Sequence, residues 1–363
     1  MEKNRLLSLD AFRGFTIAAM ILVNNPGSWN YVYSPLLHAE WNGLTPTDLI
    51  FPFFIFIVGV SITLSLGRKL ENNSGKRSIY IKIITRSAKI FLAGILLNIL
   101  NNLSFSEIRI AGVLQRIAIV YLISSVLFIN FRWKKLAYIA SAILLLYWIC
   151  LTLVPTPGYD VPMVEPGKNF SAWIDSFLLP GKMWQGNWDP EGIFSTLPAI
   201  SSCIIGILSG YLVNSKMETD RKIVWLFTLG LILSILGYCW SLQFPVNKNL
   251  WTSSFVLITS GFAAMIFAAS IFIVDSLKRT GIAKFGIVFG ANAITIYVLS
   301  DILAFVFYRI HFGSGSLNEC FLAGFQHIGL SLKLASLVYA LLFIGINFIP
   351  AILLYQRRVF VKL

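Results

Sequence analysis

The chain has 363 residues, of which 57% are hydrophobic and only 12% are charged. Soluble domains carry about 25% charged residues, so this composition excludes an ordinary soluble protein and indicates a polytopic membrane protein. The net charge of +13 does not indicate nucleic-acid binding, because the basic residues occur in short clusters between apolar runs rather than in one patch with interleaved aromatic residues. We therefore expect the lipid bilayer, and no nucleic acid, among the partners of this protein.

Ten apolar runs are long enough to cross a bilayer, whose core of about 30 Å needs about 20 residues of helix. The strands of a membrane β-barrel would instead appear as alternating segments of about ten residues. The sequence therefore predicts an all-α polytopic fold. The first run is kept as a span rather than a signal peptide, because Asp10 and Arg13 interrupt it and no small-residue cleavage site follows. The predicted spans are residues 9–27, 47–67, 80–100, 111–130, 134–154, 192–213, 222–242, 250–275, 284–308 and 332–354.

Lysine and arginine alternate between two sets of connections, and this alternation predicts the orientation. Cytoplasmic connections are enriched in these residues, so both termini are expected in the cytoplasm, and His38, His311 and His327 on the outer face. The set assigned to the cytoplasm has nineteen members: Lys3, Arg5, Arg68, Lys69, Lys76, Arg77, Lys82, Arg132, Lys134, Lys135, Lys216, Arg221, Lys222, Lys278, Arg279, Lys284, Arg357, Arg358 and Lys362. The outer set has five: Arg109, Lys168, Lys182, Lys248 and Arg309.

The longest outer connection, at about residues 155–191, is acidic and aromatic. It could be a lid or a sugar-binding surface, or its tryptophans could simply anchor the protein at the membrane interface. We expect a single transmembrane domain over residues 1–363 with this loop on the outer face. The absence of an internal repeat disfavours an inverted-repeat transporter. The acidic and tryptophan residues of the loop are Asp160, Glu165, Asp175, Asp189, Glu191, Trp173, Trp184 and Trp188.

Several charged residues lie inside predicted spans, where such groups are costly and often functional. Asp10 and Arg13 are three residues apart and are predicted to pair on one helix face. Arg86 and Lys89 are also three apart, but like charges need an anionic partner. That partner could be a phosphorylated ligand that enters from the cytoplasm.

Arg116 would extend this basic track towards the outer half of the membrane. The alternative is a set of internal salt bridges from these cations to Asp10, Asp48 or Asp301.

Histidine occurs only three times in the chain, and His38 stands in a polar stretch that leads into the span at 47–67. Because histidine changes charge near neutral pH, His38 is the first candidate for catalysis. Glu40 and Asp48 are close to it in the sequence, and either carboxylate could orient the imidazole. We predict Asp48, because it begins the next helix.

Two long motifs carry a resemblance to a known family: Arg5-Leu-Leu-Ser-Leu-Asp-Ala-Phe-Arg-Gly14 and His38-Ala-x-Trp-Asn-Gly-Leu-Thr-x-x-Asp-Leu-x-Phe-Pro52. They resemble the heparan-α-glucosaminide N-acetyltransferase family. The Leu-Asp-x-x-Arg-Gly piece alone would also fit the wider transmembrane acyltransferases that O-acetylate sugars. The resemblance continues in Arg109-Ile-x-Gly-Val-Leu-Gln-Arg116, Asp189-Pro-Glu-Gly192, Pro245-Val-Asn-Lys-Asn-Leu-Trp251, and Gly290-x-Asn-Ala-Ile294 with Tyr297.

The resemblance implies a ten-helix acyltransferase domain that takes acetyl from acetyl-coenzyme A in the cytoplasm. The acetyl group would pass to the amino group of a glucosamine-type sugar on the outer face. The family's catalytic histidine corresponds to His38 and its partner asparagine to Asn24. For the coenzyme phosphates we predict Arg86 and Lys89 first, then Arg13 and Arg116. We expect no metal cofactor.

The resemblance further implies a multi-pass protein of the bacterial inner membrane, with the active histidine on the periplasmic side. The expected partners are an amino-sugar or glycan acceptor and, in a homodimer, a second copy of the chain. Two alternatives stay open at this point. One is an O-acetyltransferase of an envelope polysaccharide, and the other is an amino-sugar transporter or permease that transfers no acyl group.

Overall fold

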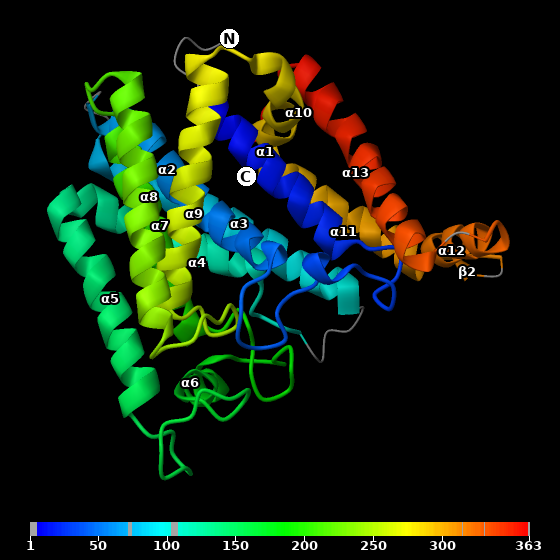
Figure 1. Ribbon diagram of the computed structural model, residues 1–363, viewed down its shortest axis with the longest axis horizontal. Helices are drawn as coiled ribbons and strands as arrows, with labels where there is room; N and C mark the ends of the chain where they lie inside the picture. Colours follow the sequence, from blue (N-terminus) through cyan, green and yellow to red (C-terminus); the bar gives the residue numbers. More distant parts are fainter. Residues whose placement is uncertain (1–5, 72–74, 103–107, 314, 330, 362–363) are drawn as a thin grey trace. The chain divides into compact units, whose positions relative to one another are not determined.

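The computed structural model describes residues 6–71, 75–102, 108–313, 315–329 and 331–361. Helices dominate this part of the chain (Figure 1), which confirms the predicted all-α class. One small antiparallel hairpin pairs β1 (His311–Phe312) with β2 (Gly315–Ser316). Lys3, Arg5 and Lys362 of the predicted cytoplasmic set lie outside the described residues.

The long helices fall where the apolar runs predict them, and two short helices, α6 and α12, occupy connections where none is predicted. The helices are α1 (Leu7–Asn24), α2 (Ile50–Glu71), α3 (Lys76–Asn102), α4 (Val113–Asn130), α5 (Trp133–Leu153), α6 (Phe170–Leu178), α7 (Ile193–Val213), α8 (Thr219–Ser241), α9 (Ser253–Ser270), α10 (Thr280–Ala291), α11 (Ala293–Arg309), α12 (Leu317–His327) and α13 (Leu332–Gln356). Two 3-10 turns, η1 (Ser34–Leu36) and η2 (Pro46–Leu49), precede α2, and a π-helical turn, η3 (Ile271–Ser276), extends α9.

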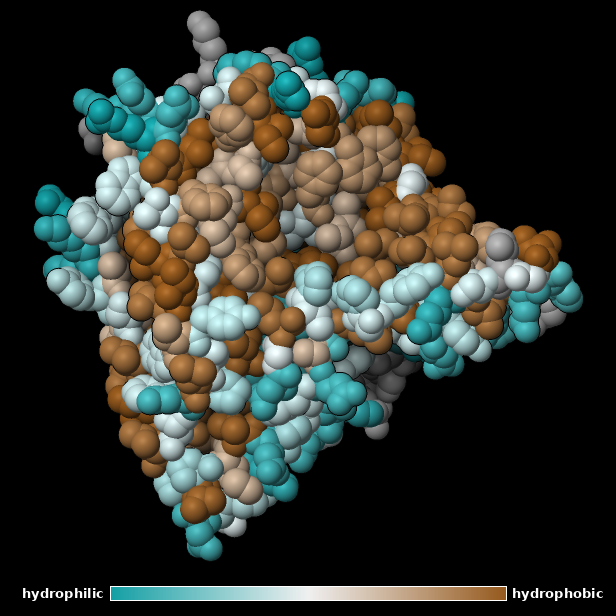
Figure 2. Space-filling model, in the orientation of Figure 1, coloured by the Kyte–Doolittle hydropathy of each residue, from teal (hydrophilic) through white to brown (hydrophobic). Residues whose placement is uncertain are grey.

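Nine helical segments of the described residues are long and apolar enough to cross a membrane, and a tenth span results if the bent pair α10 and α11 is counted as one. On the face shown in Figure 2, hydrophobic side chains cover much of the helical surface, as lipid contact requires. With the bent pair counted as one span, the predicted count of about ten spans is confirmed for the described residues. The orientation of the termini stays a prediction.

The ninth predicted span, 284–308, is not one straight helix: α10 and α11 meet at an angle of 75°. Asn292 lies at the break with non-helical backbone angles (φ −131°, ψ 40°). Its amide nitrogen donates to the carbonyl of Val359 at 3.0 Å, and its amide oxygen accepts from the backbone N–H of Val361 at 2.8 Å. Asparagine side chains compete with helical backbone bonds in this way, so contact with the C-terminal tail accompanies the break.

The described residues form two compact units. Unit 1 comprises residues 1–39, 45–51 and 270–363, and unit 2 comprises residues 40–44 and 52–269. Unit 1 therefore contains α1, η2 and α10 to α13, and unit 2 contains most of α2 together with α3 to α9. The expectation of one acyltransferase domain over the whole chain stays a prediction.

Glycines allow close helix packing inside each unit. In unit 1, α1 packs against α10, and a side chain at Gly290 would collide with the carbonyl of Asp10. In unit 2, a side chain at Gly206 of α7 would collide with the carbonyl of Phe56 in α2. Small residues at such crossings let the backbones approach, as is common between membrane helices.

Within unit 2, connections that were assigned to the same side of the membrane lie together. The indole N–H of Trp41 donates to the carbonyl of Val164 at 2.9 Å, and the backbone N–H of Gly43 donates to the carbonyl of Val246 at 2.8 Å. The segments at 40–44, 155–191 and 243–252 are thus joined at one end of the helices of this unit.

Candidate functional site

Asp48 organises the polar stretch that precedes α2. It is the third residue of η2, and its buried carboxylate closes a capping box with Thr45. One carboxylate oxygen, Oδ2, accepts from the backbone N–H of Thr45 at 3.0 Å, from the Thr45 hydroxyl at 2.9 Å and from the backbone N–H of Ala39 at 3.1 Å. These donors stabilise the ionised carboxylate and fix its position.

The other oxygen of this carboxylate holds His38. Nδ1 of His38 lies 2.7 Å from Oδ1 of Asp48. The Asp48 side chain is 1% exposed, whereas the His38 side chain is 46% exposed. The buried carboxylate holds one ring nitrogen of His38, and the rest of the ring is accessible. This arrangement suits acid–base or nucleophilic chemistry at the other ring nitrogen, Nε2.

The backbone on the N-terminal side of His38 is held as well. The Thr45 hydroxyl oxygen also lies 2.8 Å from the carbonyl oxygen of Leu37, a second acceptor for its single proton, and the Thr47 hydroxyl donates to the carbonyl of Pro35 at 3.2 Å. All of these groups belong to unit 1. Glu40, the other carboxylate considered from the sequence, is exposed and belongs to unit 2.

Asn24 and Arg13, two further predicted site residues, also lie in unit 1. Asn24 is the last residue of α1 and is exposed, whereas its neighbour Asn25 is buried and donates to the carbonyl of Ile21. Arg13 pairs with Asp10 at 3.0 Å, as the spacing predicts, and also donates to the carbonyl of Gly290 at 3.3 Å. Their roles with a substrate stay predictions.

Arg86 and Lys89 lie on α3 in unit 2, and both are exposed. The Arg86 guanidinium lies 5.0 Å from the centre of the Tyr121 ring, within the range of a cation–π interaction. The carboxylates named in the salt-bridge alternative have partners inside unit 1. Asp10 and Asp48 pair with Arg13 and His38, and Asp301 has a hydrogen bond with Tyr297.

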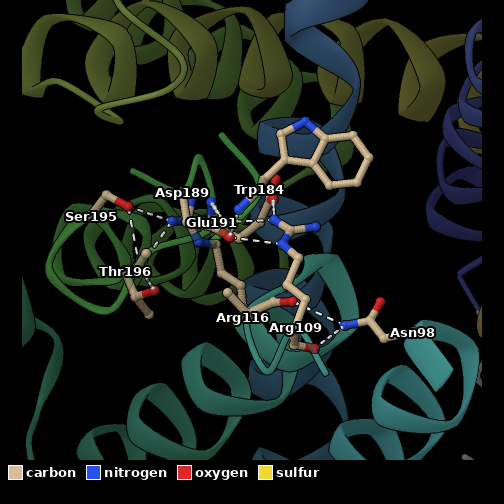
Figure 3. Close-up of polar contacts among 10 residues, drawn as sticks. Asn98, Arg109, Arg116, Trp184, Asp189, Glu191, Ser195 and Thr196 are labelled. Atoms are coloured by element: carbon tan, nitrogen blue, oxygen red, sulfur yellow. Dashed lines mark hydrogen bonds and ion pairs between the residues drawn. The ribbon is translucent and has the colours of Figure 1, made fainter. Parts of the chain in front are cut away.

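Arg116 is enclosed within unit 2. It donates to the hydroxyl of Ser195 (Figure 3) and, at 3.1 Å, to the carbonyl of Gly192, both at the start of α7. Its guanidinium lies 5.0 Å from the centre of the Trp251 ring. Within the described ranges its buried Nε and Nη1 atoms have no hydrogen-bond partner. Arg116 thus joins three of the motifs that carry the family resemblance, and two of its donors could serve a ligand.

Arg109 forms a second cluster in unit 2 that the sequence analysis did not predict. It binds Asp189 through two nitrogens and Glu191 through one, and its guanidinium lies 5.0 Å from the Trp184 ring (Figure 3). Burial lowers the pKa of Arg109, but the carboxylates of Asp189 and Glu191 outweigh this effect, so that the net pKa is raised. The available signal is the presence of opposite charges in two connections that the sequence assigns to the same side, at Arg109 and in Asp189-Pro-Glu191.

Asp175 of α6 connects the same loop to α7. Its carboxylate accepts from the backbone N–H groups of Phe194, at 3.1 Å, and Ile193. Such an acceptor satisfies the free donors at a helix N-terminus. Burial is the main effect on this group and raises the pKa of Asp175 to about 6. The loop at 155–191 is therefore tied to the helices of unit 2 at several points.

The described residues contain nine candidate spans, or ten with the bent pair, and an accessible histidine on a buried carboxylate. Together these features define a polytopic membrane protein with a site suited to proton transfer. The chain matches the sequence model described as "Heparan-alpha-glucosaminide N-acetyltransferase, catalytic" over residues 5–244, and it belongs to this family.

Two curated relatives are both named heparan-alpha-glucosaminide N-acetyltransferase. The protein from Mus musculus is 31% identical over 358 residues, covering 83% of this chain and 54% of the relative. The protein from Homo sapiens is 32% identical over 351 residues, covering 81% of this chain and 52% of the relative. The chain thus spans about half the length of the curated relatives it matches.

Proposed function

We propose that this protein is a transmembrane N-acetyltransferase. It moves acetyl from cytoplasmic acetyl-coenzyme A to the amino group of a glucosamine-type sugar on the outer face of the membrane. The observation that carries the proposal is the contact of His38 with the buried carboxylate of Asp48. Membership of the family supports acetyl transfer as the reaction, and the names of the relatives support an amino-sugar acceptor.

In this mechanism His38 acts as the general base. Asp48 holds Nδ1, so Nε2 takes a proton from the acceptor amine as the amine nitrogen attacks the thioester carbon. A carbon–nitrogen amide bond forms, the carbon–sulfur bond breaks, and the proton passes to the departing sulfur. A second route uses His38 as a nucleophile, through an acetyl-imidazole intermediate. In either route the charge of Asp48 stabilises the imidazole when it gains positive charge.

The remaining roles follow from the charges and the membrane. Asn24 donates to the thioester oxygen as negative charge develops there, a contribution of about 3 kcal/mol when the donor is well placed. The candidates for contact with the phosphates of the coenzyme are Arg86 and Lys89 first, then Arg13 and Arg116. Its pantetheine arm, at about 15–20 Å, is comparable to half of the bilayer core of about 30 Å.

The proposal places the protein in a bacterial inner membrane, with His38 on the periplasmic side. It also treats residues 1–363 as one transmembrane domain.

The test is an acetylation assay with membranes that contain the full chain, acetyl-labelled coenzyme A and glucosamine. The proposal expects labelled N-acetylglucosamine from the wild type and none from a His38→Ala variant, while a His327→Ala variant keeps full activity. Accumulation of unmodified sugar would favour the transporter instead. A product whose acetyl group is released by mild base would favour the O-acetyltransferase.

A further inference from the structure

The turn at residues 25–28, directly after α1, is held by helices that come almost 300 residues later in the chain. The Tyr308 hydroxyl, in the last turn of α11, donates to the carbonyl of Pro26 at 2.5 Å. The side-chain amide of Asn318, in α12, donates to the next carbonyl, that of Gly27, at 3.1 Å. Two successive carbonyls of the turn are therefore bound by two different helices of unit 1.

A third helix, α13, binds the N–H groups of the same turn. The Ser336 carbonyl accepts from the backbone N–H of Gly27 at 3.2 Å, and the Ser336 hydroxyl accepts from the backbone N–H of Ser28 at 3.2 Å. The approach is close, because a side chain added at Gly27 would meet the Cα of Ser336 at 3.0 Å and the Cβ of Tyr339 at 3.1 Å. Packing at such distances leaves the turn little room to move.

This turn fixes the end of α1, where Asn24 lies. Asn24 is the last residue of the helix, and its side chain is exposed. Helix ends fray when they have no further contacts, but here the chain that continues from Asn24 is bound to α11, α12 and α13. A donor that stabilises a transition state has to be held within about 0.5 Å of its productive position, and the bound turn supplies such a restraint.

The same turn begins the segment that leads to His38. Leu22 and Pro26 line one small hollow together with Leu36, so the chain returns to the end of α1 just before it reaches His38. The turn therefore lies, along the chain, between the two residues to which the proposed mechanism assigns the thioester oxygen and the amine proton, Asn24 and His38.

We infer that Tyr308 and Ser336 are positioning residues for acetyl transfer. They hold the turn at 25–28 and thereby fix the place of the Asn24 amide at the thioester oxygen, without touching either substrate. Both follow residues 5–244, the region that the model of the family's catalytic part matches, so the inference extends the site to the C-terminal helices of unit 1. It rests on the proposed function, since it concerns the same reaction.

The test is a double-mutant cycle on the full chain in membranes, with acetyl-coenzyme A and glucosamine as substrates. Tyr308→Phe is made in the wild type and in an Asn24→Ala variant. It removes only the hydroxyl and keeps the ring, whose centre lies 5.9 Å from that of the Tyr339 ring.

Tyr355→Phe is the matched control, because it also removes a tyrosine hydroxyl from unit 1. Tyr355 packs against a cluster that includes Ala11, and at 1.5 Å per residue Ala11 lies about 20 Å from Asn24 along α1. We expect the control to keep the kcat of the wild type.

We expect Asn24→Ala to lower kcat about 100-fold and Tyr308→Phe to lower it about tenfold, because a displaced donor loses part of its effect on the transition state. In the Asn24→Ala variant, Tyr308→Phe should change kcat by less than about twofold, since the group through which it acts is gone. KM should stay the same for both substrates, because the contact of Asn24 is made in the transition state. Ser336→Ala should behave like Tyr308→Phe, and it keeps the test open if Tyr308→Phe does not fold.

The full loss from Tyr308→Phe in the Asn24→Ala variant as well would overturn the inference. A lower Tm with normal kcat per folded molecule would overturn it too, because Tyr308 would then serve stability alone. If Asn24→Ala keeps the kcat of the wild type, the inference is wrong while acetyl transfer by the protein stands. If the wild type forms no N-acetylglucosamine, the proposed function itself is wrong.

Discussion

Each of the two units contains a basic side chain bound to a buried carboxylate, and the two clusters differ in what stays accessible. In unit 1, Asp48 is buried but the His38 ring is nearly half exposed. In unit 2, Asp189 is fully buried, and Arg109, only 15% exposed, is enclosed by two carboxylates and the Trp184 ring. The cluster of His38 and Asp48 leaves a reactive ring accessible, whereas the charged groups of the Arg109 cluster are used in contacts with one another.

The chemistry of the two basic side chains reinforces this difference. Imidazole can take up and release a proton near neutral pH, whereas guanidinium stays charged and offers five fixed donors. The same pairing therefore gives a site for proton transfer when it contains an exposed histidine, and a rigid connection between loops when it contains a buried arginine. Substitutions in the two clusters should separate activity from stability.

The largest expected effect is that of His38→Ala on activity. General-base catalysis contributes about 10²–10⁴-fold, and without the imidazole no group in the cluster replaces it, so we expect acetyl transfer to fall by about 1,000-fold or more. Membrane insertion should match the wild type, whereas thermal stability should fall modestly, because the buried carboxylate of Asp48 loses one of its hydrogen-bond partners. The measurement is labelled acetyl transfer per folded molecule; substantial residual turnover would remove His38 from the mechanism.

Arg109→Ala should have the opposite profile, with a large loss of stability and normal activity per folded molecule. It leaves the carboxylates of Asp189 and Glu191 without their cation, and breaking a buried ion pair costs about 3–5 kcal/mol. Thermal unfolding in detergent measures this loss.

Lys168→Ala is the matched control for Arg109→Ala, because it removes an exposed ion pair with Glu165 that is worth at most about 1 kcal/mol. Equal stability of the two variants would show that the Arg109 cluster does not hold the loop.

The sequence predicts the first cluster and misses the second because of the distances along the chain. His38 and Asp48 are ten residues apart and are joined through one local capping turn, and Asp10 and Arg13 lie within one helical turn. Arg109 and Asp189 are 80 residues apart, and only the packing of the loops brings them together. Local spacing is readable from a sequence, whereas contacts between distant segments are not.

The same argument applies to the helices. Continuous apolar runs predict the spans, because a helix needs only its own backbone bonds to cross a bilayer. The break at Asn292 depends on Val359 and Val361, almost 70 residues later, and no local signal indicates that contact.

The pH dependence of stability tests the environment of Asp175, which lies in the same loop as the partners of Arg109. Its pKa is about 6 in the folded protein against an ordinary value of 3.8, so the folded state binds more protons between these two values. Stability should therefore fall as pH rises from about 4 to about 6 and then level off. A shift of about two units corresponds to at most about 3 kcal/mol.

Asp175→Asn retains an acceptor for the start of α7 but cannot ionise. The difference in Tm between the wild type and this variant should change between pH 4 and pH 6 and be constant above pH 7. A constant difference over the whole range would mean that Asp175 does not titrate there.

Asp48→Asn tests whether the buried carboxylate acts on catalysis through His38. The amide keeps the shape of the side chain but loses the charge that stabilises a protonated imidazole, so kcat should fall about 100-fold. KM for acetyl-coenzyme A should change little, because Asp48 acts through His38 rather than on the coenzyme. A rise in KM with normal kcat would contradict this positioning role.

The smallest expected effect concerns two cations of unit 2 that, unlike Arg109, are exposed. Arg86→Gln and Lys89→Gln should each weaken coenzyme A binding about tenfold, or about 1.4 kcal/mol, if these side chains contact its phosphates. Arg77→Gln is the matched control, since Arg77 is an exposed cation on the opposite side of α3. Calorimetric titration of coenzyme A into the purified full chain measures the three affinities. Unchanged binding together with a lower Tm would give Arg86 and Lys89 a structural role like that of Arg109. An equal loss of coenzyme A affinity in the Arg77 variant would indicate a general effect of positive charge.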